Sequence, residues 1–182
     1  GLWFLMKLYH GDCVEIMKKL PNSIIDMTIT SPPYDNLRNY NNTLNWNFDI
    51  FKNIAQELYN ITKVGGVVVW IVGDKTINGS ETGSSFKQAL YFKEIGFNLH
   101  DTMIYQKKDY IPLTHNRYEQ EFEYMFCFSK GKPNTFNPIK IKTKNSGKTV
   151  KNASYYKTDN DKTTIVKEYK VKDTKIKGNI FL

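Results

Sequence analysis

The sequence predicts an α/β fold: a mostly parallel sheet with flanking helices and one late antiparallel strand. Three observations predict it: strand-like apolar runs alternate with stretches of helical periodicity, turn residues separate them, and 40% of the 182 residues are apolar. The length is typical of one domain, or one domain with a tail. With 14% aromatic residues there is enough material for a buried core, which excludes wholesale disorder.

The first elements are a short strand over 7–10, a turn at Gly11–Asp12 and a helix over 14–20, where apolar residues recur at helical spacing. A β-branched run over 24–30 follows and predicts a strand buried on both faces. Ser31–Tyr34 ends this strand abruptly, because two consecutive prolines cannot continue it.

The later elements continue the alternation of helix and strand. Apolar residues form one stripe over 46–63, which predicts a helix, and an uninterrupted apolar run over 67–72 predicts a second buried strand. A helix is expected over 84–95, and two further strands over 97–106 and 122–129, the last of them antiparallel.

Ligands of open sheets of this kind bind beyond the carboxyl ends of the strands. The predicted strand ends carry Asp12, Ser31–Tyr34 and Gly73–Asp74. Asp12 could equally cap the following helix, and Asp74 is expected to be a turn residue.

Positive charge is concentrated at the C-terminal end of the chain. Residues 131–182 hold 13 lysines against four acidic residues, a net charge of +9, while residues 1–130 have a net charge of −1. A basic segment beside a near-neutral body indicates a polyanionic partner, with nucleic acid as the first candidate, although a solvated lysine-rich tail fits equally well. One edge strand is expected over 164–172.

Other classes of protein are excluded or disfavoured. The longest apolar run, 64–72, is much shorter than the roughly 20 residues of a membrane span. Cys13 and Cys127 lie far apart without CxxC spacing, so neither a disulfide framework nor a metal site is indicated. We expect a cytoplasmic protein without membrane contact.

The Ser31-Pro32-Pro33-Tyr34 turn carries the chemistry. The prolines make it stiff, and it presents the Ser31 hydroxyl, the Pro32 carbonyl and the flat ring of Tyr34. A flipped-out base with an exocyclic amino group would match all three, since its two N–H groups meet two acceptors while its ring stacks on the tyrosine.

Together with Gly11-Asp12-Cys13, this turn resembles the amino-group DNA methyltransferases that use S-adenosylmethionine, in the permuted order with the catalytic motif first. Gly65–Gly66 before the second buried strand, and the hairpin formed around 116–131, are similar to later parts of that family. The resemblance covers residues 7–138.

The resemblance implies a partial Rossmann-like methyltransferase sheet and a role for each motif residue. Residues 7–138 would be the catalytic part of a methyltransferase domain. Residues 139–182 would be a basic segment that contacts DNA or recognises the target, and part of this segment could be disordered. Ser31 and the Pro32 carbonyl would orient the target amine, with Pro33 stiffening the turn and Tyr34 stacking on the base. Asp12 would accept a hydrogen bond from the adenosyl group of the cofactor.

The substrate would be double-stranded DNA, with cytosine N4 favoured over adenine N6 by the serine in the motif. RNA or a protein amide remains an alternative substrate. The family's Phe-x-Gly-x-Gly segment, which approaches the methionine part of the cofactor, is absent, because no two of the eleven glycines are separated by a single residue. We therefore expect an incomplete cofactor pocket, a missing C-terminal half or second chain, and weak cofactor binding. The alternative is a catalytically inactive DNA-binding module or one half of a split enzyme.

Overall fold

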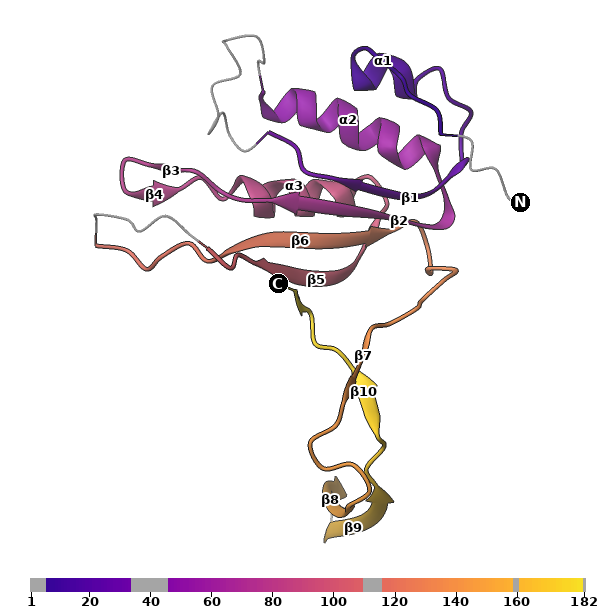
Figure 1. The fold of residues 1–182 in the computed structure, drawn as a ribbon, viewed down its shortest axis with the longest axis vertical. Helices are drawn as coiled ribbons and strands as arrows, with labels where there is room; N and C mark the ends of the chain where they lie inside the picture. Colours follow the sequence, from indigo (N-terminus) through magenta and orange to yellow (C-terminus); the bar gives the residue numbers. More distant parts are fainter. Residues whose placement is uncertain (1–5, 34–45, 110–115, 159–160, 182) are drawn as a thin grey trace. The chain divides into compact units, whose positions relative to one another are not determined.

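The computed structural model describes residues 6–33, 46–109, 116–158 and 161–181. The chain divides into two units, one formed by Gly1–Thr135 with Asn179–Leu182 and the other by Phe136–Gly178 (Figure 1). The last described residues therefore belong to the first unit, although 139–182 was expected to be one continuous segment.

A five-stranded sheet with three helices forms the first unit. The helices are α1 (Cys13–Met17), α2 (Phe48–Ile61) and α3 (Ser84–Glu94). The strand order is β1-β2-β6-β5-β11, formed by Ile25–Thr30, Thr62–Val72, Phe122–Ser129, Asn98–Gln106 and Ile180–Phe181. A two-stranded hairpin, β3 (Thr76–Ile77) and β4 (Ser80–Glu81), follows β2.

The strand directions confirm the predicted sheet. β1 is parallel to β2 and β11 is parallel to β5, while β6 is antiparallel to both of its neighbours. Four strands therefore run in one direction and β6 runs in the other. Of the hairpin expected around 116–131, the structure contains β6, whose antiparallel partner β5 lies earlier in the chain.

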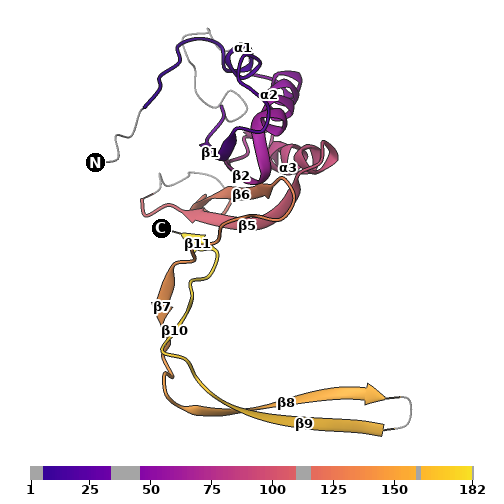
Figure 2. The same ribbon diagram turned by 90° about the vertical axis from the view of Figure 1, so that its right-hand side faces the viewer.

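The core lies between one face of the sheet and the helices (Figure 2). Alternate residues of β2, namely Val68, Trp70 and Val72, point to this side and are almost completely buried. Phe51 of α2 and Phe92 of α3 pack edge-on against the Trp70 ring, whose Nε1 donates a 2.8 Å hydrogen bond to the amide oxygen of Gln88. The periodicity of α2 and α3 thus builds one apolar layer on one face of the sheet.

The second unit consists of two antiparallel strand pairs. β7 (Lys140–Lys142) pairs with β10 (Thr174–Ile176), and β8 (Thr149–Thr158) pairs with β9 (Asp161–Lys170). Only one edge strand was expected here, because alternation of polar and lysine residues predicts strands weakly when neither face is strongly apolar.

Two further expectations from the sequence are wrong. Residues 7–10 form no strand. β1 is not buried on both faces, because it lies at the edge of the sheet and the helices cover only one side: the Met27 and Ile29 side chains are 53% and 63% exposed. The described residues contain no helix that is long and apolar enough to cross a membrane.

Candidate active site

The Ser31 turn begins where β1 ends. Thr30 pairs with Trp70 of β2, so the residues that follow leave the sheet at its carboxyl edge. Ser31 is exposed, Pro32 is buried and Pro33 is half-buried. Tyr34 lies outside the described residues. The buried Pro32 thus follows an exposed Ser31 directly at this edge of the sheet.

The close approach of β1 and β2 positions this turn. A Cβ atom on Gly66 would lie 3.0 Å from the carbonyl oxygens of both Ile25 and Asp26, and 2.9 Å from the Thr62 methyl group. Only glycine fits there without displacing the backbone of β1. Lys63 adds an exposed ion pair with Asp26 at 2.8 Å.

Asp12 caps helix α1. Its Oδ1 accepts hydrogen bonds from the backbone N–H groups of Val14 (2.9 Å) and Glu15 (3.1 Å). The capping alternative is therefore what the structure contains. Within the described residues no hydrogen bond is recorded to Oδ2 of this exposed carboxylate, so one oxygen stays available. Burial, with the charge of Asp12 as a second cause, raises the pKa of the neighbouring Cys13 thiol.

Asp74 lies beyond the end of β2 and acts as the cap of α3. Its carboxylate accepts hydrogen bonds from the Ser85 backbone N–H (2.8 Å), the Ser85 hydroxyl and the Ser84 hydroxyl (3.1 Å). The N-cap residue Gly83 has no side chain, so Asp74 supplies the missing acceptor from another segment. Asp74 was expected to be a turn residue; in the structure it is the cap of α3.

An aromatic cluster at the same edge was not predicted. Tyr124 packs edge-on against Phe86 and Phe122, with ring centroids 5.2 and 5.3 Å apart. Burial raises the pKa of the Tyr124 phenol, and the charges of Asp74 and Glu81 raise it further. Tyr124 pairs with Val72, which lies two residues after Trp70, the partner of Thr30 at the end of β1. The signal was present in the period-2 aromatic pattern of Phe122, Tyr124, Phe126 and Phe128.

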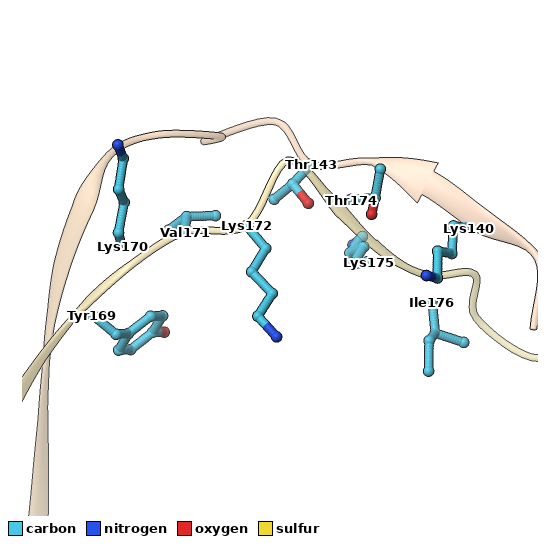
Figure 3. A pocket seen from close by; sticks show the side chains of 9 residues that line it. All are labelled: Lys140, Thr143, Tyr169, Lys170, Val171, Lys172, Thr174, Lys175 and Ile176. Carbon is cyan, nitrogen blue, oxygen red and sulfur yellow. The ribbon is translucent and has the colours of Figure 1, made fainter.

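The cavities lie elsewhere. One of about 460 Å³ beside α1 is lined by Tyr9, His10, Ile16, Lys19, Leu20 and Pro21. Another of about 570 Å³ lies in the second unit, and we call it the lysine groove; its lining is Lys140, Thr143, Tyr169, Lys170, Val171, Lys172, Thr174, Lys175 and Ile176. In Figure 3, Lys172 and Tyr169 point to the same side of the strands, while Lys170 points away.

Two basic side chains of the first unit donate hydrogen bonds to backbone carbonyls. Arg117 donates to the Gly79 carbonyl of the β3–β4 hairpin. Lys130 at the end of β6 donates to the carbonyls of Tyr59 (2.7 Å) and Thr62 (3.0 Å), where α2 ends. Among the described residues, no group of three His, Cys, Asp or Glu side chains could hold a metal ion.

The residues expected to hold the cofactor supply only some of the contacts that the resemblance implies. Asp12 has one exposed carboxylate oxygen that takes no part in the cap of α1. The Gly-x-Gly turn expected to approach the methionine part of the cofactor does not occur in the 182 residues, so these residues do not fit the whole group.

The strand order of this sheet, with a Ser-Pro-Pro turn directly after β1, defines an α/β protein of the methyltransferase fold class. The chain belongs to the N6/N4 DNA methylase family, whose model matches residues 25–180. It is 53% identical to the orphan methyltransferase M.BamHII of Bacillus amyloliquefaciens over 97% of this chain and 62% of that protein. It is 28% identical to the type II beta methyltransferase M.BslI of Bacillus sp. (strain NEB-606) over 72% of this chain and 17% of that protein. The chain thus spans less than two thirds of either relative.

Solved structures share the fold. The PvuII DNA methyltransferase (cytosine-N4-specific) matches with a TM-score of 0.59 at 21% identity, covering 69% of this chain and 49% of that one. The M1.HpyAVI–SAM complex matches with a TM-score of 0.52 at 20% identity, covering 87% and 61%. At this identity the matches establish the architecture of the sheet and its helices.

Proposed function

We propose that this chain is the catalytic part of a DNA amino-methyltransferase that uses S-adenosylmethionine, from a restriction–modification or phage system. Family membership supports the class of reaction. The observation that carries the proposal is the Ser31–Pro32 turn at the carboxyl end of β1, with its exposed serine and buried proline. Cytosine N4 is the favoured target, and adenine N6 is the alternative.

The turn would act by positioning the target amine of a flipped-out base. An aromatic amine is a poor nucleophile, because its lone pair is delocalised into the ring. Ser31 Oγ and the Pro32 carbonyl would accept hydrogen bonds from the two N–H groups of the amine. These hydrogen bonds would restore lone-pair character to the nitrogen and orient its lone pair for attack. Tyr34 would stack on the base, an interaction of about 1–3 kcal/mol. S-adenosylmethionine supplies an electrophilic methyl group on a sulfonium sulfur when it is bound.

The proton on the amine would leave after methyl transfer rather than before it. A serine hydroxyl is a poor general base at neutral pH, so Ser31 holds the amine without deprotonating it. Asp12, already partly used as a helix cap, would contribute its free oxygen to the adenosyl group.

The cofactor site is completed by a glycine-rich segment outside this sequence, carried on the same polypeptide or on a second chain. The absence of any Gly-x-Gly in the 182 residues supports this. We expect isothermal titration of residues 1–182 with S-adenosylmethionine to give no measurable binding at micromolar concentrations. A micromolar affinity would contradict incompleteness.

The second unit is proposed to contact double-stranded DNA. Residues 136–178 hold twelve lysines against four acidic residues, a net charge of +8, so the rest of the chain is neutral overall. The lysine groove concentrates four of these lysines beside Tyr169. A catalytically inactive DNA-binding module is the second candidate, and the same charge supports it.

Transfer of a labelled methyl group to DNA tests the function. Residues 1–182 should transfer the label only when the unmatched part of M.BamHII is co-expressed as a separate polypeptide. In that assembly Tyr34→Ala should reduce the rate at least tenfold, since base stacking is lost. The control is Tyr118→Ala, because Tyr118 is fully exposed.

Undiminished transfer by Tyr34→Ala would refute the role of the turn. DNA binding without any transfer by an assembled complex would favour the inactive module. Chromatography of digested product distinguishes N4-methylcytosine from N6-methyladenine.

A further inference from the structure

The β3–β4 hairpin follows the strand next to the one that ends in the Ser31–Pro32 turn. β1 and β2 are parallel neighbours, Thr30 pairs with Trp70, and β2 ends two residues later at Val72. The hairpin then extends past β2, at the edge of the sheet where β1 also ends (Figure 1). Neighbouring strands are about 4.8 Å apart. DNA that presents a base to Ser31 therefore also reaches this hairpin.

The base of the hairpin is fixed by hydrogen bonds. The backbone N–H of Thr82 donates to the Lys75 carbonyl at 2.8 Å, which closes the hairpin. The Thr82 hydroxyl donates a 3.4 Å hydrogen bond to Asp74 Oδ1, an atom that also accepts the Ser85 backbone N–H at the start of α3. The hairpin is thus connected both to the end of β2 and to the first turn of α3.

The tip of the hairpin is a tight turn that lies in open space. Asn78 and Gly79 have φ angles of +48° and +79°, and two positive φ angles are what a two-residue type I′ turn requires. A Cβ atom on Gly79 would meet no atom within 4 Å. Arg117, from the segment before β6, donates a hydrogen bond to the Gly79 carbonyl and so holds the tip from a second side.

The residue that precedes this turn is apolar and exposed. Ile77 pairs with Ser80, is 51% exposed and does not belong to the hydrophobic core. Single exposed apolar residues are ordinary on protein surfaces. Ile77, however, lies on a hairpin that is held at both its base and its tip. Residues 76–80 carry no charge, so phosphates do not repel the tip.

We propose that Ile77 is a wedge that enters duplex DNA and fills the space left by the flipped-out base. Apolar side chains, isoleucine among them, insert between base steps in other DNA-binding proteins. Extrusion of a base requires it to unstack, and a side chain in the gap opposes its return. The anchored hairpin suits this role, because a preorganised side chain loses little conformational entropy on insertion. Ile77 would be a positioning residue, and its role rests on the proposed function, in which the target base is flipped out.

Duplexes with one abasic site test the wedge at any sequence, because the abasic site supplies the gap in advance. Measured by fluorescence anisotropy, residues 1–182 should bind the abasic duplex about tenfold more tightly than the intact duplex. Ile77→Ala should abolish most of this preference without changing the affinity for the intact duplex. Val64→Ala is the matched control and should keep the preference, since Val64 is 71% exposed but lies near the amino end of β2.

A second readout places 2-aminopurine opposite the abasic position, where its fluorescence rises when it loses stacking. Wild-type chain should raise this fluorescence and Ile77→Ala should not. The proposal is overturned if wild type does not prefer the abasic duplex, if Ile77→Ala retains either signal, or if Val64→Ala loses as much. Methyl transfer by the co-expressed assembly, with both signals retained in Ile77→Ala, would refute the wedge alone. Both signals as expected, with no methyl transfer by that assembly, would refute the proposed function.

Discussion

Asp74 illustrates how one carboxylate connects two elements. It follows β2 and accepts the Ser85 backbone N–H, which starts a helix whose own N-cap residue, Gly83, has no side chain. The unpaired N–H groups of a first turn are costly when they are not solvated, so this long-range cap stabilises α3 and the end of β2 together.

Replacing Asp74 with alanine should therefore lower the free energy of unfolding by about 1–2 kcal/mol. Asp74→Asn keeps one acceptor oxygen and should lose less than half of that. Urea denaturation measures both. Equal losses for the two variants would show that charge, rather than capping, is the stabilising factor.

At the scale of elements, the β1–β2 pair decides where the Ser31–Pro32 turn lies. Gly66 lets the two strands approach, and the parallel register then places Thr30 beside Trp70 and Ser31 at the sheet edge. The turn is thus positioned by a contact between strands that lie some 40 residues apart in the sequence.

Gly66→Ala should destabilise the chain by about 1–3 kcal/mol, because the added methyl group meets backbone oxygens at 3.0 Å. Amide hydrogen exchange should rise first in β1. Gly178→Ala is the control: its Cβ would meet no atom within 4 Å. If both variants unfold at the same urea concentration, close approach does not constrain this pair.

At the scale of the whole molecule, charge is divided between the two units. Residues 136–178 carry the entire net charge of +8, and the remaining residues are neutral overall. Binding to DNA should therefore depend on this unit, with an affinity that falls steeply with salt as counterions are released.

Lysine-to-glutamine substitution at Lys140, Lys172 and Lys175 should lower the slope of log affinity against log salt by about 2–3. Fluorescence anisotropy with duplex DNA measures it. The control removes the same charge from the first unit at Lys7, Lys19 and Lys93, and should leave the slope unchanged. If the salt slope falls equally in both variants, DNA binding depends on the net charge of the chain and not on the lysine groove.

The sequence alone was sufficient for the main elements and for the motif. Helical periodicity, apolar runs and proline or glycine boundaries are local properties, so α2, α3, β5 and β6 were predicted close to their observed bounds. The strand expected over 67–72 is β2, which begins earlier, at Thr62. The Ser31–Tyr34 turn was visible for the same reason, since stiffness and acceptor oxygens follow from residue type.

Only the tertiary structure decided what these elements face. It made Asp12 and Asp74 helix caps, paired Tyr124 with the last residue of β2, and left Met27 and Ile29 exposed on a strand expected to be buried. Strand order, register and the covering of a face depend on contacts between distant residues, and a local pattern carries no information about which partner is present. That is why the run of β2 is typical of a strand buried on both faces, while the helices of the described residues cover one face of the sheet.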